Sequence, residues 1–457
     1  MTISRLIAMT TSSPRPGAAS TTRVDGPSGA LRGVVRVPGD KSISHRALIL
    51  GALAQGRSRL TGMNLGRDVL ATAAVLGRLG ASVHLTEPQA QVDVEGWGER
   101  EPHEPDDVLD AANSGTTLRC LLGVCARATG AFTFTGDGSL RQRPMARVVS
   151  PLRAMGARID GRAQGSLLPL TVRGSSLTGL AHTLPIASAQ VKTALLLAGL
   201  GAAGSTSVTE PRPSRDHTER MLVASGVPVG RRALTATVAG GGKVSPGARR
   251  IPGDLSSAAF VLAAAILVPG SDVVVPEVGI NPTRAGFLRV LAAMGADIEV
   301  EPAGEWGGEP VGTVRARSSA LRGVAVHAEE VPALIDELPI LAVVATQAAG
   351  QTLIRGAGEL RVKESDRIAT MAAGLSDLGA EVEALPDGLS IRGPTPLRPA
   401  EVDSLGDHRV AMSLAVAGLI ADGPVTVRGW DSVDTSFPGF LTTLGALRSG
   451  SSSGSRP

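Results

Sequence analysis

A sixfold repeat constrains the fold of this chain more than any other feature of its sequence. An apolar segment, a glycine and a short strand-like segment recur six times, with glycines 66 to 80 residues apart. These glycines are Gly56, Gly130, Gly204, Gly270, Gly350 and Gly423. A second set follows each of them by 22 to 29 residues: Gly80, Gly156, Gly226, Gly295, Gly379 and Gly445. Because glycine commonly ends helices and a fixed period indicates repeated units, we predict six copies of one unit.

Each unit is predicted to contain both helices and strands in a fixed order. An apolar helix and its glycine precede a strand of alternating pattern, and a second helix and glycine precede a further strand such as 81–85. The longest apolar run, 258–269, is too short to span a membrane and suits a buried helix. The sequence therefore predicts α/β architecture without a membrane span.

The six units are predicted to form two domains of three units each. Units 1–3 would form an inserted domain over residues 40–250, and units 4–6 a discontinuous domain over residues 25–39 plus 251–447. Residues 25–39 are assigned to the second domain because the strand expected at 31–37 could pair with the C-terminal half of the chain. The segment 249–253 is the natural crossover between the third and fourth units.

The two ends of the chain are predicted to be disordered. Residues 1–24 are rich in Ser and Thr and contain no acidic residue, which is typical of a disordered leader. The same composition also fits an organelle transit peptide, and Met9 could be the true start. Residues 448–457 are rich in Ser and Gly and are expected to form a disordered tail.

The composition favours a small anionic ligand over a nucleic acid. The 457 residues include 6 Phe, 3 Trp and no Tyr, so the core must be aliphatic. Proteins that bind nucleic acid commonly stack bases on aromatic side chains. The formal charge is +3, and the arginines are scattered along the sequence without forming runs. Scattered cations suit small anions better than a polyanion.

Cysteine and histidine spacing gives no sign of a metal or disulfide framework. Cys120 and Cys125 lie in one apolar segment, and the seven histidines show no ligand spacing. We therefore predict no metal site and a reducing, cytoplasmic location. The phosphate-loop and dinucleotide-binding motifs are also absent from the sequence, so nucleotide binding is unsupported.

Polar clusters stand where the first helix of each unit should begin. They include Ser, Asn and Asp, the residues that cap helix N-termini. Four cations also occur there, namely Lys41, Arg46, Arg119 and Arg409. A cation at a helix N-terminus opposes the helix dipole, so a bound anion is the simplest compensation. If the units are arranged alike, two facing domains would direct several helix N-termini into one anion-binding cleft.

Two further stretches carry charge in places that suggest chemistry. Residues 360–367 interleave both signs of charge, and Lys363 is one of only four lysines in the chain, with Lys41, Lys192 and Lys243. A solvated helix start explains this octapeptide equally well. Asp336 is a carboxylate within apolar sequence, where burial could fit it to proton transfer. Simple helix capping is the alternative interpretation of Asp336.

Taken together, the motifs resemble those of the 5-enolpyruvylshikimate-3-phosphate synthase family. They are the segments 38–47, 113–119, 141–145, 188–192, 214–219, 335–339, 360–367 and 407–409. The resemblance extends over about residues 25–446 and is closest to the second bacterial class. It implies two domains of three βαβαββ units each, an inverted α/β barrel arrangement with an interdomain cleft. It also implies enolpyruvyl transfer from phosphoenolpyruvate to the 5-hydroxyl of shikimate 3-phosphate, by a monomer without metal or organic cofactor.

The resemblance implies a set of site residues by motif. Asp336 would be the general base for the 5-hydroxyl, Glu364 the proton donor to the methylene carbon, and Lys41 the companion cation. The residues implied for shikimate 3-phosphate are Lys41, Ser42, Arg46, Ser188, Ala189, Gln190, Arg215, Asp336 and Lys363. Those implied for phosphoenolpyruvate are Lys41, Asn113, Gly115, Arg143, Gln190, Glu364, Arg367 and Arg409. Two phosphorylated acids call for several guanidinium groups, so this chemistry is consistent.

Two related functions compete with this interpretation. The sister enzyme that acts on UDP-N-acetylglucosamine shares the fold and the enolpyruvyl donor, but normally has Lys-Asn where this chain has Lys41-Ser42. A catalytically silent anion-binding relative would keep the helix caps and lose the acid and base, yet Asp336 and Glu364 are both present. Glyphosate, the family's inhibitor, occupies the phosphoenolpyruvate place, and Gly115 should leave room for it.

Overall fold

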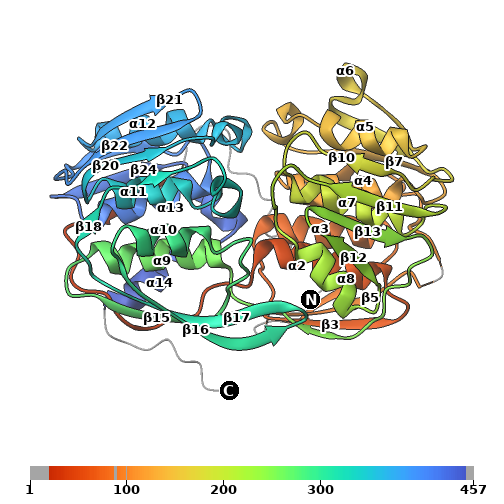
Figure 1. Cartoon of the computed structure of the whole chain (residues 1–457), viewed down its shortest axis with the longest axis horizontal. Helices are drawn as coiled ribbons and strands as arrows, with labels where there is room; N and C mark the ends of the chain where they lie inside the picture. The colour runs from red at the N-terminus through yellow and green to blue at the C-terminus, as the bar shows by residue number, and fades with distance from the viewer. Residues whose placement is uncertain (1–19, 87–89, 99, 449–457) are drawn as a thin grey trace. The chain divides into compact units, whose positions relative to one another are not determined.

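The computed structural model of the chain describes residues 20–86, 90–98 and 100–448. Its described residues divide into two compact units (Figure 1). Unit 1 contains Lys41–Ile251 together with Glu305–Glu309, and unit 2 contains the residues up to Asp40, Pro252–Gly304 and the chain from Pro310 onward. The chain therefore passes between the units after Asp40 and after Ile251, and makes a short excursion at 305–309.

Three small sheets and two sets of helices build unit 1. The first sheet has the order β14-β3-β5-β4, from Ala248–Arg250, Arg57–Thr61, Gln91–Glu95 and Ser82–Thr86. The second has the order β6-β7-β9-β8, from Leu109–Asp110, Ala131–Thr135, Leu167–Arg173 and Arg158–Gly161. The third has the order β10-β11-β13-β12, from Ala181–Thr183, Ser205–Thr209, Thr235–Ala239 and Val229–Arg232. The helices are α2 (Lys41–Leu53), α3 (Arg67–Arg78), α4 (Gly115–Cys125), α5 (Ala146–Ala154), α6 (Arg162–Gly165), α7 (Ala189–Gly199) and α8 (His217–Ala224), with the 3₁₀ turn η1 (Leu140–Gln142).

Unit 2 repeats this design with three further sheets. The first has the order β16-β17-β15-β2, from Asp297–Trp306, Glu309–Arg317, Asp272–Gly279 and Arg32–Val34. The second has the order β18-β20-β22-β21, from Leu321–Arg322, Ala348–Ile354, Gly388–Gly393 and Glu381–Leu385, and β19 (Ala325–Val326) also pairs with β20. The third has the order β1-β24-β23, from Thr21–Asp25, Pro424–Arg428 and Ala400–Asp403. The helices are α9 (Leu255–Leu267), α10 (Gly286–Ala293), α11 (Leu338–Ala345), α12 (Arg367–Asp377), α13 (His408–Gly418) and α14 (Phe440–Arg448), with the 3₁₀ turns η2 (Val331–Ala333), η3 (Gly358–Val362) and η4 (Trp430–Thr435).

The predicted sixfold repeat is confirmed, and the order of elements in the first five copies is βαβαββ. The second copy runs β6-α4-β7-α5-β8-β9, in which β6 and β7 are parallel and the last two strands form an antiparallel hairpin. Every repeat glycine except Gly445 lies at positive φ, where glycine ends a helix or begins a strand without strain. Gly445 was predicted to follow a helix, but it lies inside α14.

Two copies borrow their first strand from elsewhere in the sequence. The parallel partner of β3 is β14, which follows the other strands of the first three copies in the sequence. The parallel partner of β15 is β2, which precedes all of the first three copies. The prediction that the strand near 31–37 pairs with the C-terminal half is therefore confirmed, although the strand itself covers only Arg32–Val34.

The sixth copy is completed by the start of the chain. After β24 the chain forms η4 and α14 in place of a strand hairpin, and β1 pairs with β24 in antiparallel register. The prediction of disorder over residues 1–24 is therefore wrong for residues 21–24, because their backbone groups bond to β24. Residues 1–19 lie outside the described part of the chain. The same holds for 449–457, whereas Arg448, which was assigned to the tail, ends α14.

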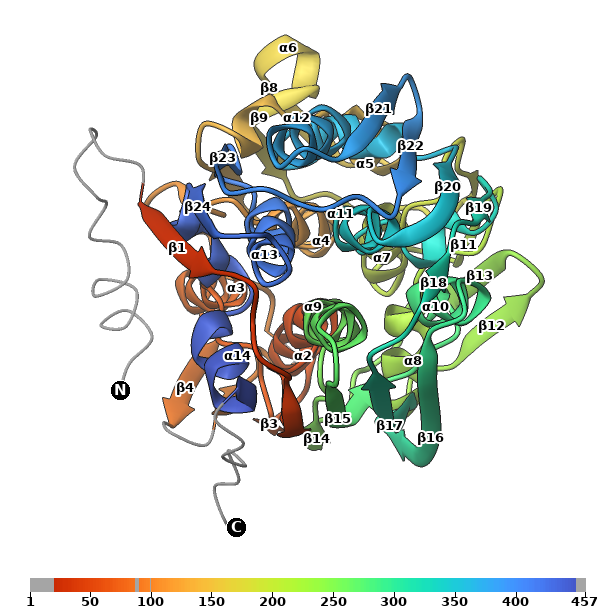
Figure 2. The ribbon, with the colours of Figure 1, turned by 90° about the vertical axis from the view of Figure 1, so that its left-hand side faces the viewer.

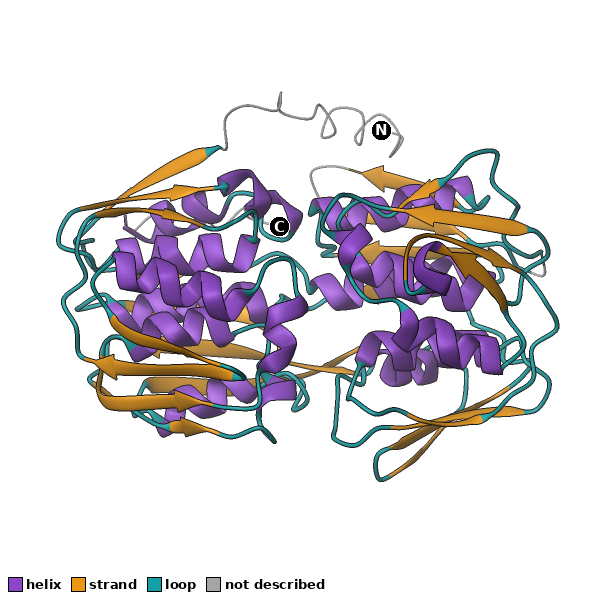
Figure 3. Ribbon diagram, turned by 90° about the horizontal axis from the view of Figure 1, so that it is seen from above, coloured by secondary structure: helices purple, strands orange, loops and turns teal. Residues whose placement is uncertain are grey.

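The first helix of each copy lies at the centre of its unit, and the sheets lie outside (Figures 2 and 3). In unit 2, α9, α11 and α13 pack against one another, and almost all of their residues are buried. A helix that is apolar on every side must be surrounded, whereas α3 and α12 keep one polar face for solvent. In unit 1, a Cβ on Gly123 of α4 would lie 2.1 Å from the carbonyl oxygen of Ala194 on α7, so only glycine permits this close packing.

The described helices include none that is long and apolar enough to cross a membrane. Within the same residues, His, Cys, Asp and Glu side chains form no group of three or more suited to a metal ion. Cys120 and Cys125 both lie in α4, are buried and are free thiols. Burial raises the pKa of both thiols.

Candidate active site

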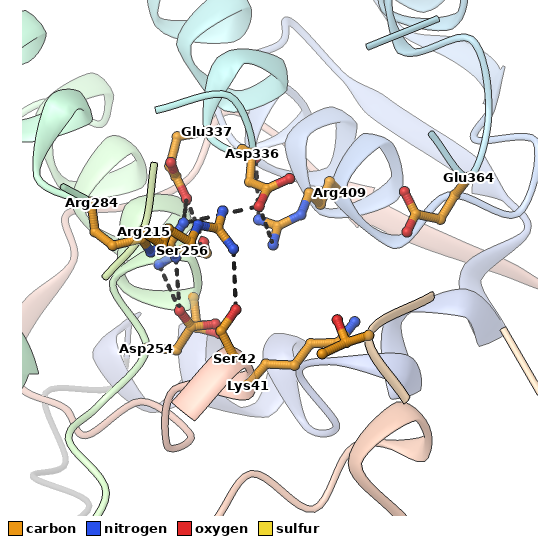
Figure 4. Close-up of polar contacts among 12 residues, drawn as sticks. Lys41, Ser42, Arg215, Asp254, Ser256, Arg284, Asp336, Glu337, Glu364 and Arg409 are labelled. Carbon is orange, nitrogen blue, oxygen red and sulfur yellow. Dashed lines mark hydrogen bonds and ion pairs between the residues drawn. The ribbon is translucent and has the colours of Figure 1, made fainter. Parts of the chain in front are cut away.

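The start of α2 in unit 1 carries the first group of predicted site residues. Arg46 is buried, and it donates hydrogen bonds to the carbonyl of Ser42 at 2.9 Å and to the hydroxyls of Thr193 and Thr218 at 2.9 and 2.8 Å. Arg215, in the loop before α8, donates to the Ser42 hydroxyl at 3.1 Å (Figure 4). These bonds hold two guanidinium groups beside one helix N-terminus, and the partners of Arg46 are neutral.

The starts of α4 and α7 bring together a second group. Arg143 donates to the Asn113 side-chain oxygen at 2.9 Å, and Gln190 accepts from Arg119 at 2.6 Å. Gly115 lies between the two arginines, because a Cβ added there would be 2.8 Å from Arg119 Nη1 and 3.5 Å from Arg143 Nη1. The absence of a side chain at Gly115 therefore leaves space directly in front of two guanidinium groups.

The predicted helix caps are present in both units. The side chains of Ser114, Ser188, Asp254 and Asp407 each accept a backbone N–H in the first turn of α4, α7, α9 and α13. Since each cap satisfies only part of its helix N-terminus, the remaining N–H groups and the helix dipole still favour an anion.

Lys41 forms an ion pair that was not predicted from the sequence. Its ammonium lies 2.5 Å from the carboxylate of Asp68, in the first turn of α3, and both side chains are largely buried. An acidic residue is common in the first turn of a helix, so nothing in the local sequence of Asp68 marks it as the partner of Lys41.

In unit 2 a buried guanidinium gathers three carboxylates. Arg367, at the start of α12, is 1% exposed and donates to Glu364 at 2.6 Å, to Asp407 at 2.8 Å and to Asp336 at 3.3 Å. Burial alone would lower the pKa of Arg367, but Asp407, Glu364 and Asp336 outweigh it and the pKa lies above its ordinary value. The stretch 360–367 is therefore more than a solvated helix start.

Asp336 is surrounded by arginines and does not cap a helix. The N-cap of α11 is Glu337, and its side chain makes no capping hydrogen bond. The Asp336 carboxylate lies 3.3 Å from Arg367, 3.7 Å from Arg409 and 3.9 Å from Arg284, and Arg409 also donates to its backbone carbonyl (Figure 4). The capping alternative for Asp336 is thereby excluded, and a positioned, ionised carboxylate is what the contacts favour.

The structure adds an ionic network below Asp336 that sequence reasoning missed. Arg284 is 3% exposed and lies 3.4 Å from Asp254 and 3.6 Å from Glu337, and it donates to Ser256 at 2.5 Å. Ser256 in turn donates to Glu337. Arg284 precedes α10 by two residues, so the argument from helix-start cations could have identified it had α10 been considered with the first helices.

Burial and charge both act on Asp254 within this network. Burial and the nearby Asp40 raise the pKa of Asp254 to about 6, while Arg284 and Arg409 act in the opposite direction. For Arg284 itself burial would lower the pKa, but Glu337, Asp40 and Asp254 raise it above its ordinary value.

The whole length of both units matches one protein family. A family model described as EPSP synthase (3-phosphoshikimate 1-carboxyvinyltransferase) matches residues 26–444. This chain belongs to the EPSP synthase family. The resemblance drawn from the sequence motifs is therefore confirmed, and the same match favours it over the sister enzyme acting on UDP-N-acetylglucosamine.

Individual EPSP synthase relatives support the assignment. A 3-phosphoshikimate 1-carboxyvinyltransferase of Synechococcus sp. (strain JA-3-3Ab) is 54% identical over 424 residues, covering 92% of this chain and 95% of the relative. One from Gloeobacter violaceus is 53% identical and covers 92% of this chain and 98% of its own length. The solved structure of EPSP synthase from Acinetobacter baumannii has a TM-score of 0.83 at 42% identity and covers 93% of this chain and 98% of its own. The enolpyruvyl transferase NikO from Streptomyces tendae, at 20% identity and a TM-score of 0.73, shares the fold.

The site residues expected from the EPSP synthase resemblance divide between the two units. Those in unit 1 are Lys41, Ser42, Arg46, Asn113, Gly115, Arg143, Ser188, Ala189, Gln190 and Arg215. Those in unit 2 are Asp336, Lys363, Glu364, Arg367 and Arg409. Within unit 2 ionic contacts join Asp336, Glu364, Arg367 and Arg409. Lys363 is half-buried, directly follows η3 and precedes Glu364 in the sequence. Their roles toward substrate, and the predicted cleft between domains, stay predictions.

Proposed function

We propose that this EPSP synthase family member transfers the enolpyruvyl group of phosphoenolpyruvate to the 5-hydroxyl of shikimate 3-phosphate and releases phosphate. The family match over residues 26–444 supports the reaction. The observation that carries the assignment of roles is Asp336, a carboxylate fixed by three guanidinium groups that has no part in capping α11. Residues of both units would act on the same two substrates.

Asp336 is proposed as the general base and Glu364 as the general acid of the addition step. Asp336 takes the proton of the 5-hydroxyl while the hydroxyl oxygen bonds to C2 of phosphoenolpyruvate. The electrons of the C2–C3 double bond then take a proton from Glu364 at C3. In the elimination step Glu364 takes back a proton from the new methyl group, the C2–O bond to phosphate breaks and the double bond is restored. The departing phosphate takes the proton that Asp336 accepted, so both carboxyl groups return to their starting states. Lys41 stabilises the negative charge that develops near the reacting oxygens.

Binding of the donor would change the partner of Glu364. In the free protein Glu364 accepts from Arg367 at 2.6 Å, and this pairing favours the ionised carboxylate, which cannot donate a proton. The phosphate and carboxylate groups of phosphoenolpyruvate would compete for Arg367 and Arg409. Glu364 would then lose its contact with Arg367, and the carboxyl group could turn toward the methylene carbon to supply the proton that the addition step needs.

The anions of the substrates are assigned to the helix starts of unit 1. Arg46 and Arg215 beside Ser42, with the α7 turn Ser188–Gln190, would hold shikimate 3-phosphate. Arg143 and the space in front of Gly115 would accept phosphoenolpyruvate.

We also infer a cytoplasmic monomer, which the free cysteines and the family resemblance support. Light scattering after size-exclusion chromatography would test the monomer.

The test is a coupled assay of phosphate release with purified protein. Phosphate should be released when phosphoenolpyruvate and shikimate 3-phosphate are both present, and product should carry the enolpyruvyl group by mass spectrometry. UDP-N-acetylglucosamine in place of shikimate 3-phosphate should give no release. Turnover that depends on the nucleotide sugar, or none with either acceptor, would overturn the proposal.

A further inference from the structure

Lys192 lies in a buried ionic cluster of unit 1 to which the proposed mechanism gives no task. Its side chain, on α7, is 6% exposed, and its ammonium is 2.7 Å from Glu210 and 2.8 Å from Glu219, each 3% exposed. Burial would lower the pKa of Lys192, but Glu219 and Glu210 outweigh burial and raise it. Lysine is rare in this chain, and this one is held as a charged group inside the protein.

Glu210 connects this cluster to two of the proposed substrate-binding segments. One oxygen of its carboxylate accepts the backbone N–H of Ser188 at 2.9 Å, and the other accepts the hydroxyl of Ser214 at 2.9 Å. Ser188 caps α7 at the turn assigned to shikimate 3-phosphate. Ser214 immediately precedes Arg215, which donates to Ser42. One carboxylate thus fixes the backbone of one segment and the side chain beside the other.

Lys192 is the cation that accompanies the buried carboxylate of Glu210. A carboxylate inside a protein is strongly disfavoured unless a cation or several donors accompany it. The cluster contains two carboxylates, and Glu219 has one oxygen without a hydrogen-bond partner within the described residues. Removing the ammonium would leave two buried carboxylates without their shared cation, so they would repel each other and move apart. This movement would loosen the contacts of Glu210 with Ser188 and Ser214.

Thr193, the residue after Lys192 on α7, connects this turn of the helix to Arg46. Thr193 accepts a hydrogen bond from Arg46 at 2.9 Å and shares a hydrogen bond with Thr218 at 2.5 Å. Glu219, the second partner of Lys192, directly follows Thr218. Lys192 on α7 and Glu219 on α8 are therefore the sequence neighbours of the two threonines whose hydroxyls hold Arg46.

We propose that Lys192 is a positioning residue that acts through Glu210 to hold Ser188 and Arg215 at the spacing required by the phosphate of shikimate 3-phosphate. The inference rests on the proposed function for the identity of that ligand. It assigns Lys192 a role in affinity for the acceptor substrate and none in affinity for phosphoenolpyruvate.

The test combines Lys192→Met, Ser214→Ala and the double variant. Lys192→Met should raise KM for shikimate 3-phosphate about tenfold or more, the usual effect of losing a hydrogen bond to a charged group, and leave KM for phosphoenolpyruvate within about threefold. Ser214→Ala breaks only one arm and should raise the same KM about threefold. If Lys192 acts through Glu210 and Ser214, the double variant should be no worse than Lys192→Met, because the two changes interrupt one path. Lys243→Met, which removes an exposed lysine, is the matched control.

Several outcomes would overturn the inference. An unchanged KM for shikimate 3-phosphate in Lys192→Met, an equal rise in both KM values, or effects that multiply in the double variant would each do so. Should Lys192→Met fail to fold, an unaltered acceptor KM in Ser214→Ala at an unaltered melting temperature would be decisive against it. Calorimetric titration of shikimate 3-phosphate measures the same effect without turnover. Wild-type protein that binds this ligand but releases no phosphate would refute the proposed function while leaving the positioning role open to that binding test.

Discussion

The buried site arginines Arg46 of unit 1 and Arg367 of unit 2 are held in different ways. In unit 1, Arg46 is buried with hydroxyl and carbonyl partners, which orient the guanidinium without cancelling its charge. In unit 2, Arg367 is buried with three carboxylates, which outnumber its single positive charge. A cation with neutral partners can bind an anion directly, whereas a paired one can do so only by giving up a carboxylate. Under the proposed function, Arg46 could bind a substrate anion directly, whereas Arg367 could do so only after releasing a carboxylate such as Glu364.

The largest effect should come from Asp336→Asn in unit 2. The variant keeps the shape of the side chain but cannot accept the hydroxyl proton, so kcat should fall by about a thousandfold. Binding of shikimate 3-phosphate, measured by calorimetry, should change by less than about threefold. Asp377→Asn, an exposed position on α12, is the control and should match wild type. Turnover within tenfold of wild type would remove Asp336 from the mechanism.

Asp407→Asn should cost the most stability, because it leaves the buried Arg367 with one carboxylate fewer and weakens the cap of α13. Breaking a buried ion pair typically costs about 3–5 kcal/mol, which urea unfolding would measure. Glu401→Gln cuts the exposed pair with Arg428 and should cost less than about 1 kcal/mol. Equal losses in the two variants would contradict the role given to burial.

The ionic network of unit 2 should also respond to pH through Asp254. Its pKa of about 6 in the folded protein exceeds the ordinary unfolded value of about 4, so the folded state binds the proton more tightly. This contribution to stability is fully present below about pH 4 and is lost as the pH rises through 6, for a total of about 3 kcal/mol. The free energy of unfolding of wild type relative to Asp254→Asn should decline accordingly between about pH 4 and pH 7. A constant difference would show that Asp254 does not titrate in this range.

The smallest change is expected in unit 1, from Thr218→Val. This substitution removes a hydroxyl that accepts from Arg46 and shares a hydrogen bond with Thr193, at nearly constant volume. Arg46 keeps two other neutral acceptors, so the free energy of unfolding should fall by only about 1–2 kcal/mol. A loss as large as that of Asp407→Asn would break the comparison between the units, because it would show that neutral and ionic partners matter equally.

Local patterns made the fold predictable, and long-range pairing did not. The glycines predicted the sixfold repeat because a helix end is decided by a few neighbouring residues. The pairing of β1 with β24 joins residues such as Thr21 and Arg428, and nothing near Thr21 in the sequence reveals its partner. Gly445 failed as a helix end because the sixth copy has no strand hairpin after it.

The site was predictable to the extent that its residues stand at helix starts. Lys41, Arg46 and Arg409 were identified from their conflict with a helix dipole, which requires only knowing where a helix begins. Asp68 and Arg284 were missed because their importance comes from side chains that meet across separate helices. Motif resemblance supplied the expected roles of Asp336 and Glu364, for which local sequence left capping or solvation as equal alternatives.

The strand exchange at the start of the chain bears on how the protein is made. During translation β1 and β2 leave the ribosome before unit 1 is made. Their partners, β24 for β1 and β15 for β2, are synthesised only after all of residues 41–251. Residues 41–251 can thus begin to fold on the nascent chain before the partners of β1 and β2 are synthesised, and the segment 305–309 joins unit 1 later. Completion of the last sheet depends on joining Thr21 to Arg428, a closure of very high contact order that is expected to be slow.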